Sequence, residues 1–264
     1  MIIQYETIIF EVKDHVACIT LNRPDAANGV TLAIGKDLMH ASIRCDEDSE
    51  IRAVLLTGAG KMFSAGGDLK YFAGLGDELP SVLKETTVHC HLAISHFMRM
   101  NAPLITAVNG AAAGIGMSIA ICGDIVLAAE SSMFMAAYTA AGLSPDGSMT
   151  YVLPRVVGLT RAKELMLTNR RLSAKEALEW GLINKVVPDD ELMKEAEALA
   201  RKFASGPTLS FGSVKKLLNK TFSETLESQM EHESRGITDM TRTADGKEGI
   251  AAFMECRRPD FKGL

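Results

Sequence analysis

The chain has 264 residues, of which 47% are hydrophobic and 23% charged, and its formal net charge is −5. This composition is typical of a globular protein with a substantial core, and the negative charge gives no general attraction for nucleic acid or an anionic membrane. We therefore expect neither as a partner. No uncharged apolar run approaches the roughly 18 residues that suggest a membrane span.

The cysteines indicate the compartment. There are five, odd in number, scattered and without a CxxC spacing, which favours free thiols in a reducing environment. The opening residues MIIQYETIIF have no basic region and are not typical of a secretory signal. We expect a cytoplasmic protein.

Taken in chain order, the first half alternates strands and helices. Residues 8–24 predict a hairpin that turns at Lys13-Asp14. The periodicity then predicts helices over 31–45 and 81–100 and buried strands over 51–58, 103–110 and 124–130. Strands separated by helices indicate an α/β fold with largely parallel pairing.

The pattern becomes helical after Pro154. Helices are expected over 160–169, 173–181 and 189–204, the second opening with the capping-box spacing of Ser173 and Glu176. The Gly206-Pro207 break divides a core, residues 1–205, from a helical module, residues 206–264. The module is too thin for a core of its own, so we expect it to pack on the body, on another subunit or on both.

Two glycine-rich turns follow buried strands, KMFSAGGDL at 61–69 and NGAAAGIGMS at 109–118. Small residues let the backbone approach a ligand and offer its N–H groups. Neither turn fits GxxxxGK[ST], and GxGxxG is absent, so phosphate binding is disfavoured. Two interpretations stay open: tight packing of backbone on backbone, or an oxyanion hole that needs two fixed donors.

A single formal charge, Asp146, lies between Ser131 and Pro154. Ser-Pro-Asp-Gly is good turn chemistry, so a solvated turn is one interpretation. The other is an acid or base in an apolar pocket, where burial raises its pKa.

Several segments together resemble the enoyl-CoA hydratase/isomerase (crotonase) family. They are LNRP, FSAGGDL, AVNGAAAGIG, CGDIVLAAESSMF and GLSPDG, in order from residue 21 to 147, and the likeness continues to the terminal AFMECRRPDFKG. The resemblance implies a spiral of ββα units with a C-terminal helical trimerisation region. It also implies an acyl-CoA thioester substrate and a homotrimer or dimer of trimers. CoA would arrive as part of the substrate, with no metal or redox cofactor.

The resemblance also assigns positions. The N–H groups of Gly67 and Ile115 would bind the thioester oxygen, and Ala65 and Leu69 would line the path of the CoA adenine and pantetheine. Two basic residues near the C-terminus, Arg258 and Lys262, resemble those that reach CoA phosphates, often across a subunit interface. A solvated basic tail is the alternative for these two.

The sequence departs from the hydratase pattern at two positions. The two glutamates that hold water in the family's hydratases would fall at Ser118 and Tyr138, and neither is a carboxylate. Serine and tyrosine are poor general bases at neutral pH, which disfavours two-glutamate hydration. Tyr138 would hydrogen-bond the substrate or Asp146, or fill core. The PDG after GLS resembles branches that shift double bonds or open epoxide-type rings, where an aspartate at the position of Asp146 moves the proton.

His91 lies in HCHLAISH, which holds three of the six histidines. Their spacing lacks the i,i+4 pair that best places two metal ligands on one helix face, so no metal site is expected. The position of His91 matches a histidine near the acyl group in an aryl-CoA dehalogenase branch, although a surface role is as reasonable. In that branch the aspartate at position 146 is a nucleophile.

We therefore expect an acyl-CoA enoyl isomerase in which Asp146 shuttles a proton and Gly67 and Ile115 hold the enolate. One alternative is dehalogenation, with Asp146 as nucleophile and His91 activating water. Others are a hydratase with an atypical site, and a catalytically silent acyl-CoA binder or nucleic-acid-binding relative, the latter weakened by the acidic pI.

Overall fold

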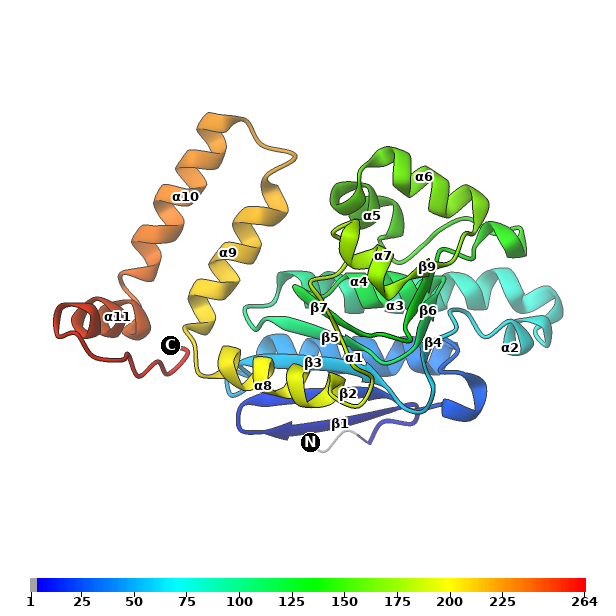
Figure 1. Cartoon of the computed structure of the whole chain (residues 1–264), viewed down its shortest axis with the longest axis horizontal. Coiled ribbons are helices and arrows are strands. Elements are labelled where there is room, and N and C mark those ends of the chain that lie inside the picture. Colours follow the sequence, from blue (N-terminus) through cyan, green and yellow to red (C-terminus); the bar gives the residue numbers. More distant parts are fainter. Residues whose placement is uncertain (1–3) are drawn as a thin grey trace.

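The computed structural model describes residues 4–264 and is built on two β-sheets (Figure 1). The larger sheet has the strand order β1-β2-β3-β5-β7-β10, with β1 and β2 antiparallel and every other neighbouring pair parallel. Its strands are β1 (Ile8–Lys13), β2 (Val16–Leu21), β3 (Ala53–Gly58), β5 (Leu104–Val108), β7 (Ile125–Ala129) and β10 (Lys185–Val187). The hairpin, the buried strands and the parallel pairing are as predicted.

The hairpin turn lies one residue later than the predicted Lys13-Asp14. Lys13 still pairs with Val16, so Asp14 and His15 form the two-residue turn. Both have left-handed backbones, with φ of 51° and 64°. Two-residue hairpins favour such turns because their twist matches that of the strands, and Asp tolerates this conformation.

The smaller sheet was not predicted. It consists of β4 (Met62–Ser64), β6 (Ala111–Ala113), β8 (Met133–Met135) and β9 (Leu172–Ser173). The first three of these follow β3, β5 and β7 respectively, so the chain repeats a long strand, a short strand and a helix. This repeat is the ββα spiral that the resemblance implied. Segments of three residues are too short to show a two-residue period, so the sequence indicated only turns there.

The helices of the core cover both faces of the larger sheet. Those that precede the C-terminal module are α1 (Leu32–Glu47), α2 (Leu69–Ala73), α3 (Leu79–Arg99), α4 (Ile115–Ile121), α5 (Met149–Val157), α6 (Leu159–Thr168), α7 (Ala174–Glu179) and α8 (Leu192–Ala204). Helices α1 and α3 belong to the main core cluster, while α8 packs its buried alanines on the opposite face. The capping box of Ser173 and Glu176 is present. Pro154 lies inside α5, so the helical region starts before that proline rather than after it.

Three helices form the C-terminal module, α9 (Thr208–Lys220), α10 (Leu226–Met240) and α11 (Ala244–Met254). Figure 1 shows α9 and α10 as an antiparallel pair that extends from the body, with α11 beyond them. Within residues 4–264, neither core cluster includes a residue after Ala204. The helical content is as predicted, and the boundary at residue 206 stays a prediction. No helix in the described part of the chain is both long enough and apolar enough to cross a membrane.

An ion pair between the buried Lys215 and the Asp124 carboxylate, whose side chain is 28% exposed, attaches α9 to the core. The Nζ of Lys215 donates to the carbonyls of Phe97 and Ala102 at 2.9 and 3.1 Å and pairs with Asp124 Oδ2 at 2.7 Å. Asp124 Oδ2 also accepts the N–H of Leu104 at 2.7 Å. Burial raises the pKa of Asp124, and the Lys215 ammonium opposes that shift. The Lys215 ammonium therefore contacts three oxygens, two of them main-chain carbonyls and one a carboxylate oxygen.

Replacing Lys215 by methionine should destabilise the protein. The substitution leaves two carbonyls and the partly exposed Asp124 carboxylate without their cation, and leaving buried polar groups without a partner costs about 1–3 kcal/mol. Urea unfolding measures the change in the free energy of unfolding. The exposed neighbour Lys216→Met is the matched control and should change that free energy by less than about 0.5 kcal/mol. Equal stability of the two variants would contradict the role of Lys215.

Candidate active site

A cavity of about 320 Å³ lies between the two glycine-rich turns, α3 and the loop that leads to α5. Its walls are mostly apolar side chains, among them Val30, Phe72, Leu83 and Leu143. Asp146 is the only carboxylate among the described residues that line it. The cavity therefore combines an apolar wall with one acid, as expected of a site for a small apolar group.

The two turns pack on each other through glycine backbones. Gly66 and Gly114 both have left-handed φ, at 93° and 50°. A Cβ atom on Gly66 would lie 2.7 Å from the Ala113 carbonyl oxygen and 3.4 Å from the Gly114 Cα. Any side chain at position 66 would push the turns apart, so the interpretation of tight backbone packing holds, while the oxyanion hole stays a prediction.

The amides that follow these glycines are those of Gly67 and Ile115, and both residues line the cavity. The N–H of Val30 donates to the Gly66 carbonyl at 2.7 Å, and Asp68 N–H donates to the Val30 carbonyl at 3.0 Å. The Gly67 amide between these bonds therefore points away from Val30. Within residues 4–264, neither the Gly67 nor the Ile115 N–H donates to another group. The two amides are free to bind a ligand oxygen.

Asp146 lies in the turn before α5 and is partly buried. Its Oδ1 accepts a hydrogen bond from the Tyr138 hydroxyl at 2.7 Å. Burial raises the pKa of Asp146, and the Tyr138 hydrogen bond opposes that shift. The carboxyl is not in bulk water, which removes the solvated-turn interpretation.

Ser118 and Tyr138 support Asp146. The two hydroxyls are 3.0 Å apart, and Ser118 Oγ also donates to the Asp146 backbone carbonyl at 3.0 Å. Burial raises the pKa of Tyr138 above its ordinary value of about 10, so its hydroxyl stays protonated and donates. Sequence reasoning had weighed a core role against a hydrogen bond for Tyr138. The structure gives it both, because the ring is buried and the hydroxyl contacts the acid.

His91 does not line this cavity. It lies on α3 beside a second cavity of about 360 Å³, and its Nε2 accepts the Gly147 N–H at 3.0 Å. The preceding residue, Cys90, does line the cavity that contains Asp146, and burial raises the pKa of its thiol to about 12, so it is not a thiolate nucleophile. No cluster of three or more metal-ligating side chains occurs in the part of the chain that the structure describes.

The residues expected along a CoA path lie at the mouth of the cavity. Ala65 and Leu69 line it, and both are exposed. A separate hollow of about 830 Å³ is lined by Arg23 and Lys70, which sequence reasoning did not select, and by Asp25 and Asp68. The signal for Arg23 was present, because it belongs to the LNRP segment.

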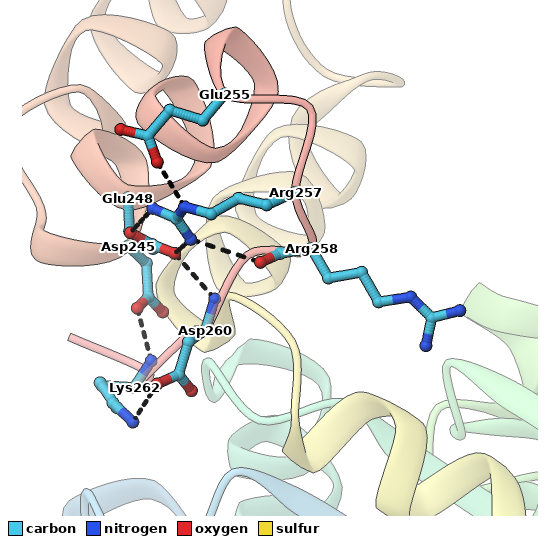
Figure 2. A network of polar contacts seen from close by, with 7 residues as sticks. All are labelled: Asp245, Glu248, Glu255, Arg257, Arg258, Asp260 and Lys262. Carbon is cyan, nitrogen blue, oxygen red and sulfur yellow. Dashed lines mark hydrogen bonds and ion pairs between the residues drawn. The ribbon is translucent and has the colours of Figure 1, made fainter.

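Arg258 and Lys262 lie far from the cavity, in the tail after α11 and at the other end of the molecule from α2 (Figure 1). Figure 2 shows the Arg258 side chain pointing away from a network in which Arg257 bonds Glu248 and Lys262 Nζ pairs with Asp260 at 2.7 Å. The Arg257 hydrogen bonds lower the pKa of Glu248 to about 2. A CoA contact by Arg258 or Lys262 therefore requires another subunit and stays a prediction.

Comparison with known proteins places this geometry in a family. The model of the enoyl-CoA hydratase/isomerase family matches residues 11–264. The chain belongs to that family. A solved structure, a putative enoyl-CoA hydratase from Streptomyces coelicolor, superposes with a TM-score of 0.93 at 31% identity, covering 99% of this chain and 96% of its own. The expected crotonase fold is confirmed.

Relatives within the enoyl-CoA hydratase/isomerase family differ in the reactions their names give. A probable enoyl-CoA hydratase of Rhodobacter capsulatus is 39% identical, and a 1,2-epoxyphenylacetyl-CoA isomerase of Escherichia coli is 38% identical, each alignment covering 98% of this chain and 99% of the relative. A 4-chlorobenzoyl-CoA dehalogenase of an Arthrobacter species is 35% identical over 93% of this chain and 90% of its own. These comparisons establish the family, whose members carry names of different reactions.

Proposed function

We propose that the protein is an acyl-CoA enoyl isomerase, which moves a double bond or performs a related rearrangement in a CoA thioester. The observation that carries the proposal is the lone carboxylate: Asp146 faces the cavity, while the two hydratase glutamate positions hold Ser118 and Tyr138. A reaction that moves one proton within the substrate needs one acid–base group. The family's hydration mechanism uses two such groups, the two glutamates that hold the water and deliver its proton.

The proposed reaction begins when the Asp146 carboxylate takes a proton from the carbon next to the thioester carbonyl. The C–H electron pair passes into the conjugated system, and negative charge collects on the thioester oxygen. The Gly67 and Ile115 amides bind that oxygen, and losing one such donor typically costs about 3 kcal/mol. The protonated Asp146 then returns its proton to a different carbon, so the substrate is isomerised and nothing is added or lost.

The surroundings of Asp146 suit a base in this reaction. Burial raises its pKa and so makes the carboxylate a stronger base than a solvated aspartate. The Tyr138 hydroxyl favours the ionised form at the same time. The carboxylate is therefore both basic and able to ionise in an apolar cavity.

The site supports the alternatives less well. Hydration would need an acid–base pair at Ser118 and Tyr138, and burial raises the pKa of Tyr138 further from neutrality. Dehalogenation would use His91 to activate water, but its Nε2 already accepts the Gly147 N–H. Among the described residues, Phe72 and Tyr138 are the aromatic side chains that line this cavity.

The Asp146→Asn variant tests the proposal. The amide is isosteric but not basic, so the variant should bind acyl-CoA as before and lose proton exchange with solvent by at least about 100-fold. The measurement is deuterium incorporation into trans-3-hexenoyl-CoA and 1,2-epoxyphenylacetyl-CoA in D2O. Asp77→Asn, an exposed aspartate outside the cavity, is the matched control.

Three further probes separate the alternatives in the same preparation. Chloride release from 4-chlorobenzoyl-CoA would indicate dehalogenation, and water addition to crotonyl-CoA would indicate hydration. Saturable binding with no turnover or exchange would indicate a silent binder. Exchange that is unchanged in Asp146→Asn would remove Asp146 from the mechanism.

The pH profile of kcat/KM should report the Asp146 carboxylate. Activity should rise as the base ionises, with the acidic limb above the ordinary aspartate value of about 4, because burial raises the pKa. Tyr138→Phe removes the hydrogen bond that favours the carboxylate, so its acidic limb should move to still higher pH. The exposed Tyr151→Phe serves as control. A Tyr138→Phe limb at unchanged or lower pH contradicts this assignment.

We also propose that the protein assembles as a homotrimer or dimer of trimers through its C-terminal module. The exposed apolar side chains on α10 and α11 support this, with Phe253 82% exposed, Met254 76% and Ile237 70%. Their exposure on a thin module is typical of a surface that another subunit covers. The same assembly would let the tail residues Arg258 and Lys262 approach a neighbouring cavity.

Light scattering coupled to gel filtration measures this assembly directly. The wild-type mass should be three or six times the 28.4 kDa of one chain. Phe253→Glu places a charge in the proposed interface and should lower the mass, while Val12→Glu on β1, also an exposed apolar position, should not. A monomeric wild-type protein would exclude the assembly.

A further inference from the structure

We propose that His91 is a positioning residue, whose unprotonated Nε2 holds the peptide plane that carries Asp146 and thereby sets the direction of the catalytic carboxylate. The inference deepens the proposed isomerase function and depends on it for the role of Asp146. It assigns His91 a task different from the activation of water.

The turn that carries Asp146 has a demanding backbone. Gly147 and Ser148 are consecutive left-handed residues, with φ of 60° and 68°. A Cβ atom at position 147 would lie 2.3 Å from Ile115 Cδ1 and 2.8 Å from Ser118 Cβ. A non-glycine residue in the left-handed region, as at position 148, is unfavourable unless surrounding contacts hold it. This turn therefore needs external contacts.

Two of those contacts hold opposite ends of one peptide unit. In a trans peptide the C=O and the N–H point in opposite directions. The Asp146 carbonyl accepts from Ser118 Oγ at 3.0 Å, and the Gly147 N–H donates to His91 Nε2 at 3.0 Å. Rotation of this plane would swing the Asp146 carboxyl away from the cavity. Ser118 and His91 clamp it from α4 and α3.

The Gly147 amide depends on His91. Gly147 is buried, and a buried N–H without a partner costs about 1–3 kcal/mol. Among residues 4–264, His91 is the only acceptor for it. Because Nε2 accepts, the neutral ring carries its proton on Nδ1, so the lone pair at Nε2 is occupied by the backbone. His91 is exposed to solvent and lines the second cavity rather than the cavity that contains Asp146.

Two substitutions at position 91 distinguish positioning from proton transfer. In His91→Gln the side-chain Oε1 can replace Nε2 as acceptor but cannot serve as an acid or base near neutral pH. In His91→Leu the side chain still fills part of the space but has no hydrogen-bond acceptor. The activity readout is kcat and KM with trans-3-hexenoyl-CoA and with 1,2-epoxyphenylacetyl-CoA. The structural readout is amide hydrogen exchange of the peptide over residues 143–149, which requires no substrate.

We expect His91→Leu to lower kcat between about 10-fold and 100-fold with KM within about threefold of wild type, since displacing a catalytic group by 1 Å can cost about 100-fold. Amide exchange in residues 143–149 should be faster. His91→Gln should restore both kcat and protection to near wild-type values.

Three results would overturn the proposal. A His91→Gln variant as slow as His91→Leu would show that the imidazole itself transfers a proton. An unchanged kcat in His91→Leu, or unchanged exchange of the 143–149 peptide, would show that the clamp is not needed. If neither thioester reacts, the proposed function fails instead, and the exchange data still decide whether His91 holds the turn.

Discussion

The close contact between the backbones of Gly66 and Gly114 determines where the candidate chemistry takes place. It brings together the ends of β4 and β6, two parallel strands from successive ββα repeats, and leaves the amides of Gly67 and Ile115 at one cavity. A side chain at position 66 cannot be accommodated, so the spacing of the amides is set by the repeat itself. The donors are backbone groups of a packed frame and need little reorganisation when charge develops on a ligand.

Against this fixed frame, the acid depends on side-chain support. A carboxylate in an apolar cavity is unfavourable unless hydrogen bonds compensate for its lost hydration. Tyr138 supplies one bond to the carboxyl, and Ser118 and His91 hold the peptide that follows it. These three residues come from separate segments, so the orientation of Asp146 depends on the packing of the whole core rather than on the local turn sequence.

Much of the fold was predictable because its signals extend over many residues. The strand 51–58 is a continuous apolar run, and the helix at 174–179 opens with a complete capping box. The three-residue strands carry no such period and were missed. The isolation of Asp146 among apolar residues left a solvated turn and a buried acid open, and the family resemblance favoured the acid. The contact of His91 was not predictable, because it involves a backbone amide whose direction depends on the φ of Gly147 and Ser148. Arg258 and Lys262 illustrate the remaining limit, since a chain folded alone does not place them at the cavity.

The residues around Asp146 differ from the two-glutamate arrangement expected of the family's hydratases, because Ser118 and Tyr138 occupy both glutamate positions. A glutamate at position 138 would remove the hydroxyl that now donates to Asp146 Oδ1 at 2.7 Å and add a second acid, on a shorter side chain, to the same side of the cavity. Two carboxylates in one apolar cavity disfavour each other's ionisation. A glutamate at position 118 would remove the hydroxyl that holds the Asp146 carbonyl. The two designs therefore compete for the same small volume. In this chain both positions hold hydroxyl groups that hydrogen-bond Asp146, one at its carboxyl and one at its backbone carbonyl.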